Sequence, residues 1–128
     1  MKYHFSVVIN FKKDVDVKSL SKKFKLEPYK LTELKDSKAL PGFDKVAKMW
    51  YRTKDIEDAN VNVQFDKFVE KVKDYFEGLQ NILKENDGNC HFEIIFTKLE
   101  HYPIIAMNNN SAKTLGELGA DFSVDFIV

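Results

Sequence analysis

The alternation of apolar and polar residues predicts four β-strands, over residues 2–11, 46–54, 90–99 and 121–128. In each, side chains two positions apart share a face, and one face is strongly apolar, as in a half-buried strand. In the second strand the pattern leaves open whether Trp50 and Arg52 or their neighbours face away from the core. The apolar faces of the other three are formed by Tyr3, Phe5, Val7, Ile9 and Phe11; by Cys90, Phe92, Ile94 and Phe96; and by Phe122, Val124, Phe126 and Val128.

Helical spacing predicts one long helix between the second and third strands. It is expected to end at Asn86-Asp87-Gly88, with Gly88 as a left-handed cap. Two shorter helices are expected, one capped by Asp14 or Asp16 and the other capped by Ser111 and ended by Gly119. The apolar stripe of the long helix runs for about six turns through Phe65, Phe68, Val69, Val72, Phe76, Leu79, Ile82 and Leu83.

These elements predict an α+β fold for residues 1–128 as a single domain. Strands with one apolar face suit a two-layer sandwich, with a mostly antiparallel four- or five-stranded sheet and helices packed on one face. Residues 27–44 form a long lysine-rich connection that Pro41-Gly42 closes, and 104–107 is expected as a short edge piece.

Composition narrows the class of protein. The chain is 44% hydrophobic and has eleven Phe, which favours a well-filled core. No stretch approaches the roughly 20 apolar residues that a membrane span needs, so no membrane association is expected. The N-terminus lacks a signal-peptide pattern, and Cys90, the only cysteine, can form no internal disulfide. A cytoplasmic location is therefore expected.

Charge is balanced in total but not along the chain. Residues 1–60 hold 14 basic and 9 acidic side chains, whereas residues 61–128 hold 6 and 11. A nucleic-acid partner is not expected, because such binders usually carry a strong net positive charge. The split could instead steer a charged partner. Arg52 is the only arginine among 20 basic residues.

The chain resembles a family of small uncharacterised bacterial domains known as domain of unknown function 4279. The resemblance rests on the opening strand, Leu26-Glu27-Pro28, the aromatic strand around Trp50, the long helix, and the ending Leu118-Gly119-Ala120-Asp121-Phe122-Ser123-Val124-Asp125-Phe126. It covers nearly the whole chain, although residues 29–44 match weakly. The family implies no established activity; some such small proteins resemble immunity proteins encoded beside bacterial toxins.

The second face of the predicted sheet is the candidate site. It mixes acids, imidazoles and hydroxyls with branched apolar residues, a combination that suits a ligand or partner. Its alternatives are an ordinary wet face or a face covered by residues 27–44. The candidate binding residues are His4, Ser6, Trp50, Arg52, His91, Glu93, Asp121, Ser123 and Asp125.

No familiar catalytic or phosphate-binding motif occurs in the chain. Cys90 shares its face with apolar residues, which favours a buried, inert thiol over a nucleophile. His91 and Glu93, with His4 and Asp125, could form a metal site only if strand order brought them together, and cross-strand pairing is the simpler interpretation. No metal or cofactor is therefore predicted.

Three functions remain open. The first is a non-catalytic binding protein of the immunity type, which binds and neutralises a bacterial toxin. The second is a small-ligand-binding or sensor domain that uses the same sheet face. The third is a hydrolase-like enzyme with a histidine–carboxylate pair, His4 with Asp125 or Glu93. The sequence specifies no oligomeric state.

Overall fold

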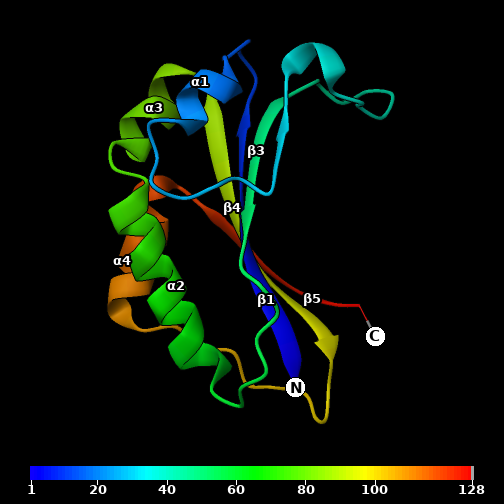
Figure 1. The fold of residues 1–128 in the computed structure, drawn as a ribbon, viewed down its shortest axis with the longest axis vertical. Helices are drawn as coiled ribbons and strands as arrows, with labels where there is room; N and C mark the ends of the chain where they lie inside the picture. Colours follow the sequence, from blue (N-terminus) through cyan, green and yellow to red (C-terminus); the bar gives the residue numbers. More distant parts are fainter. Residues whose placement is uncertain (128) are drawn as a thin grey trace.

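A computed structural model describes residues 1–127 as an α+β fold built on one five-stranded sheet. The strand order is β2-β3-β1-β4-β5, and all neighbours are antiparallel except β4 and β5, which are parallel. The four α-helices lie on one side of the strongly twisted sheet (Figure 1). The predicted fold class is therefore confirmed, and the sheet has an uncovered second side.

The central strand, β1 (Lys2–Phe11), pairs along its length with β3 (Ala47–Arg52) and β4 (Gly88–Lys98). Its alternating aromatic and branched residues suit a pleated surface buried on one face. The core-facing side chains of all three strands are fully or almost fully buried, as predicted for β1 and β4 and left open for β3. These are Tyr3, Phe5, Val7, Ile9, Phe11, Ala47, Met49, Tyr51, Cys90, Phe92, Ile94 and Phe96.

The predicted long helix is wrong in one respect: it is two helices. α2 covers Val61–Tyr75 and α3 covers Leu79–Glu85. Gly78 separates them in a left-handed conformation with φ of 79°, which costs glycine little. Both helices turn their apolar residues toward the sheet, so the spacing of apolar residues did not reveal the break.

The shorter helices confirm one predicted cap and correct another. α1 (Val17–Ser21) begins after Asp16, whose carboxylate accepts the N–H of Ser19. α4 spans Asn109–Leu118, and its cap is Asn108, which accepts the N–H of Ser111. Ser111 is therefore inside the helix, where its hydroxyl donates to Asp66 of α2 at 2.6 Å. Gly119 ends α4 with φ of 59°, as predicted.

The connections also differ from prediction. The 27–44 segment contains β2 (Lys30–Thr32) and a 3-10 turn, η1 (Leu34–Asp36). β2 extends the sheet at its edge, whereas 104–107 forms no strand. Asp87 is the left-handed residue before β4, not Gly88. Gly88 is required for another reason, because an added Cβ would lie 2.8 Å from the Phe11 ring.

The last strand, β5 (Asp121–Phe126), has the predicted alternation, but its apolar face is only partly buried. Phe122 packs against Phe65 at 5.3 Å between ring centroids, while Phe126 stacks on Phe96 and remains 44% exposed. β5 is less enclosed than its alternation suggests because it lies at the sheet edge. Val128, which was predicted to face the core, lies outside the described residues.

Candidate functional site

All nine predicted site residues lie on the side of the sheet opposite the helices, which we call the open face. β-sheet register sets them in cross-strand rows, since directly opposed residues point to the same side. Two of these rows are complete across four strands. One runs Arg52, Ser6, Glu93, Ser123, the next runs Trp50, Val8, His91, Asp121, and a third contains His4, Ile95 and Asp125.

The open face resolves the ambiguity about the second strand. In β3, Met49 and Tyr51 are completely buried in the core, while Trp50 and Arg52 are partly exposed on the other side. The remaining side chains of the open face follow from the same alternation. Besides Val8 and Ile95, they are Asn10, Lys30, Thr32, Lys48, Asn89 and Thr97.

Charge is divided across this face. Lys30, Lys48 and Arg52 stand on β2 and β3, whereas Glu93, Asp121 and Asp125 stand on β4 and β5. β1 lies between the two groups. The charge asymmetry between the two halves of the sequence thus becomes a basic side and an acidic side of a single surface.

Asp55, which the sequence analysis did not single out, joins the site beside β1. If the β1–β3 register continued, Tyr3 would face Asp55, but Tyr3 pairs with Ile56. The segment therefore carries one extra residue, which re-aims its side chain in the manner of a β-bulge. No local pattern in Thr53-Lys54-Asp55 indicates this irregularity.

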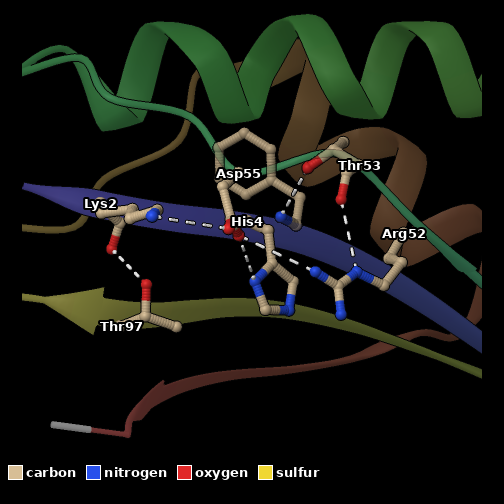
Figure 2. Close-up of polar contacts among 7 residues, drawn as sticks. Lys2, His4, Arg52, Thr53, Asp55 and Thr97 are labelled. Carbon is tan, nitrogen blue, oxygen red and sulfur yellow. Dashed lines mark hydrogen bonds and ion pairs between the residues drawn. The ribbon is translucent and has the colours of Figure 1, made fainter.

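Three basic side chains converge on the Asp55 carboxylate (Figure 2). His4 Nδ1 lies 3.5 Å from Oδ1, the Arg52 guanidinium 3.8 Å from the same oxygen, and Lys2 Nζ 3.9 Å from Oδ2. The predicted partners of His4, Asp125 and Glu93, form no such contact with it within residues 1–127. The histidine–carboxylate pairs are instead His4 with Asp55 and His91 with Glu93.

The environment of His4 favours its neutral form. Burial lowers the pKa of the imidazole below its ordinary value, and the positive charge of Arg52 lowers it further, while Asp55 acts in the opposite direction. Because the side chain is also almost inaccessible, His4 is poorly placed to exchange protons with a substrate.

Arg52 is held by aromatic and carbonyl groups as well as by Asp55. Its guanidinium carbon lies 4.9 Å from the centre of the Tyr29 ring, and Nε donates to the carbonyl of Thr53 at 3.4 Å. Tyr29 in turn contacts Trp50 edge-on at 4.6 Å. The planar guanidinium suits this stacked arrangement better than an ammonium would, and Tyr29 is a second residue that sequence reasoning missed.

On the acidic side, His91 Nε2 lies 2.9 Å from Ser123 Oγ and 3.5 Å from Glu93 Oε1. A hydrolytic triad needs the serine on one ring nitrogen and the carboxylate on the other, so that the carboxylate orients the ring and stabilises the imidazolium formed when the base takes the serine proton. In this cluster one nitrogen faces both groups. The contact is therefore a polar cluster that lacks the geometry of a catalytic triad.

Several polar atoms of the open face are buried without a hydrogen-bond partner among the described residues. They are His4 Nδ1, Ser6 Oγ, Asn10 Oδ1 and Trp50 Nε1. An unpaired buried polar group costs about 1–3 kcal/mol. Such groups are expected to be few. The hydroxyls of the core-facing Tyr3 and Tyr51 also lack a partner among residues 1–127, so the open face shares this property with the core.

The basic side of the open face continues into a hollow of about 620 Å³. The hollow lies under residues 36–46 at the β2 edge, and Lys30, Lys38 and Lys48 line it together with Leu40 and Phe43. Leu40 and Phe43 are each 72% exposed. Within residues 27–44, Leu40 and Phe43 therefore border the open face, while Tyr29 packs on Trp50 and Arg52 of its rows.

The sequence analysis also considered a reactive cysteine and a metal site. Cys90 is buried in the core, where burial raises the pKa of its thiol to about 12, in agreement with the inert interpretation. Across residues 1–127, no three His, Cys, Asp or Glu side chains are grouped as metal ligands would be. Nor does any helix in that range have the length and apolar character to cross a bilayer.

Comparison with known proteins gives a family but no activity. The family model described as "Domain of unknown function (DUF4279)" matches residues 1–128, which is the whole chain. Neither the curated proteins nor the solved structures include a significant match.

Proposed function

Since the chain belongs to this family of domains of unknown function, we propose its role from the open face: it is a non-catalytic binding protein that docks a partner protein there. We propose further that it is of the immunity type, acting in the bacterial cytoplasm to occupy and neutralise a toxin. The immunity role comes from the family resemblance, while the site comes from the geometry.

The observation that carries the proposal is the division of charge on a sheet face that no α-helix covers. A partner protein with two charged patches would match this surface. Its acidic patch would lie on Lys48 and Arg52, and its basic patch on Glu93 and Asp125. Complementary charges guide encounter and fix orientation in protein complexes. Trp50 lies on the same strand as Arg52. Trp and Arg are among the residue types that contribute most to the binding energy of protein interfaces.

Catalysis is the weaker explanation because neither histidine is arranged for it. His4 is enclosed by Asp55, Arg52 and its neighbours, and His91 presents one nitrogen to both its acid and its hydroxyl. Binding requires no such order of groups, only a surface whose exposed charges a partner can satisfy.

The test begins with affinity capture from the native cell, followed by titration calorimetry of the captured protein against Arg52→Lys, Glu93→Ala and Asp125→Ala. We expect each variant to weaken binding. Losing one member of a desolvated charge pair costs about 2–5 kcal/mol. Glu70→Ala is the matched control, because Glu70 is an exposed acid on α2 in the opposite layer.

Wild-type affinity in all three variants would show that the open face is not the site. The immunity role has its own requirement: the captured protein must arrest growth when expressed alone, and co-expression of this chain must relieve the arrest. A partner that binds the open face without toxicity would retain the binding function and refute the immunity role.

A second candidate is a small-ligand-binding domain, and the hollow beside β2 is the observation that favours it. Its volume of about 620 Å³ lies within the range of about 300–1,000 Å³ usual for ligand sites. Its three lysines outnumber the two acids that also line it, Asp36 and Asp44, which favours an anion. Lys38→Ala and Lys48→Ala would then reduce the thermal stabilisation by an anionic ligand without affecting capture of a protein.

A further inference from the structure

β5 is the more exposed of the two sheet edges. Its only neighbour in the sheet is β4, and it lies at the outside of the sheet near the C-terminus (Figure 1). The other edge, β2, is only three residues long, whereas β5 has six. An edge strand presents a row of free backbone groups that can pair with another chain.

The hydrogen-bond pattern shows which backbone groups of β5 point outward. Ile127 N donates to the carbonyl of Phe96 at 2.8 Å. Because strand residues alternate in direction, Asp121, Ser123 and Asp125 also face β4. The N–H and C=O groups of Phe122, Val124 and Phe126 therefore point away from the sheet, and within residues 1–127 no other strand pairs with them.

The side chains of β5 give this edge two distinct sides. Asp121 and Asp125 are exposed on the open face, and neither forms an ion pair in the described part of the chain. At the end of the strand Phe126 is 44% exposed and Ile127 66% exposed, and Tyr102, 82% exposed, contacts the Phe126 ring at 5.8 Å. The edge thus combines acidic positions with an exposed apolar end.

A second copy of this chain fits the edge poorly. Two-fold symmetry would pair β5 with itself in antiparallel orientation. Centred on Ser123, that pairing sets Asp121 opposite Asp125 of the other copy, twice. Centred on Val124 it sets Asp125 opposite Ser123, and no register gives either acid a basic partner, because β5 contains no Lys or Arg. Like charges directly opposed destabilise a strand pair. The edge is therefore suited to a strand of different sequence and opposite charge.

We propose that β5 accepts an extended segment of the partner protein as a sixth strand of the sheet, and that this segment alternates Lys or Arg with apolar residues. Its basic side chains would lie opposite Asp121 and Asp125, and its apolar side chains beside Phe122, Val124 and Phe126. The inference deepens the proposed function and rests on it, since it states how the partner reaches the acidic side of the open face.

The probe for this proposal is a capped ten-residue peptide of alternating lysine and valine, with an alternating glutamate–valine peptide as its comparison. Amide NMR shifts should move at Phe122, Val124 and Phe126 when the lysine peptide is added. The glutamate peptide should bind more weakly, on the order of tenfold, because two facing charge pairs change sign.

Charge exchange supplies the decisive variant. Asp121→Lys with Asp125→Lys should reverse the preference, so that the glutamate peptide binds more tightly. Asp44→Lys with Glu77→Lys, two exposed acids away from β5, changes net charge equally and should keep the preference for lysine. The double variant Asp121→Asn with Asp125→Asn should bind the two peptides with similar affinity. It replaces the double lysine variant in the test if that variant does not fold.

Shifts confined to another element, no shifts, or equal affinity for both peptides in the wild type would overturn the proposed strand addition. Because the peptides require no native partner, that outcome is separate from the calorimetry of the captured protein. Wild-type partner affinity in the Arg52, Glu93 and Asp125 variants would refute open-face docking, whatever the peptides do.

Discussion

At the scale of single residues, the molecule separates side chains that hold the fold from side chains that shape the open face. Phe68 and Phe76 are buried in the aromatic core, as their positions in the apolar stripe predicted. Phe76 contacts Phe24 at 4.8 Å and Tyr51 at 4.6 Å between ring centroids. His4, by contrast, is buried among charged groups on the opposite side of the sheet.

Phe68→Ala or Phe76→Ala should lower the free energy of unfolding by about 3–5 kcal/mol. Removing a buried Phe side chain loses its transfer free energy and also leaves a cavity. Urea denaturation measures the loss. Val63→Ala is the control on the same helix, since Val63 is 52% exposed, and it should cost less than about 0.5 kcal/mol. A similarly small loss at either Phe would show that the stripe is not part of the core.

His4 should make the stability depend on pH. Because its pKa is lowered from 6.5 in the folded protein, the unfolded chain protonates more readily. The contribution of neutral His4 is therefore complete above about pH 6.5 and is lost as the pH falls toward the folded pKa.

Urea denaturation at pH 7.5 and 5.5 should show a smaller decrease for His4→Gln than for wild type. His101→Gln, at an exposed histidine, should behave like wild type. Parallel pH profiles for wild type and His4→Gln would contradict the depressed pKa. Arg52, Lys2 and Asp55 all face His4 and remain in place in both proteins.

At the scale of elements, the break between α2 and α3 shows how a single backbone conformation divides one apolar stripe. Tyr75 ends α2, and the chain passes through Gly78 with positive φ before Leu79 begins α3. The break lets each helix follow the twisted sheet in its own direction. A straight helix of their combined length would have a single direction across the sheet.

Gly78→Ala should reduce the free energy of unfolding by about 1–2 kcal/mol, because an L-residue pays for the left-handed conformation. Nothing lies within 4 Å of the added Cβ, so the effect reports backbone strain alone. Gly116→Ala inside α4, which also meets no neighbour, should stabilise by about 0.4–1 kcal/mol. Equal effects of the two substitutions in denaturation would contradict the assigned conformation of Gly78.

At the scale of the whole molecule, protection should decrease from the sheet centre toward its edges. β1 pairs on both sides along most of its length, whereas β2 is a three-residue edge and β5 is bonded on one side only. Stability of local opening follows the burial and bonding of each element.

Amide hydrogen exchange should therefore be slowest in β1 and fastest in residues 37–46. Within β5 it should alternate: Ser123 and Asp125, which face β4, should exchange more slowly than Phe122 and Val124. Uniform exchange along β5 would contradict the assigned direction of its backbone groups and would also remove the basis for strand addition.

Sequence alone was sufficient to predict four of the five strands and the buried faces of three of them, because alternation with period two assigns each side chain to a side. It left the faces of β3 open and did not predict β2. It could not reveal the helix break at Gly78, because two helices facing one sheet keep the apolar spacing of a single helix. Tertiary structure also placed Asp55 and Tyr29 in the site. Asp55 depends on an extra residue in the pairing beside β1, and Tyr29 depends on the register of β2.

Strand order likewise depended on tertiary contacts. The order β2-β3-β1-β4-β5 places the basic strands on one side and the acidic strands on the other, and it puts β5 at an edge of the sheet. The reason is physical: periodicity reports how a residue is oriented within its own strand, while the choice of neighbour depends on contacts between residues far apart in the chain.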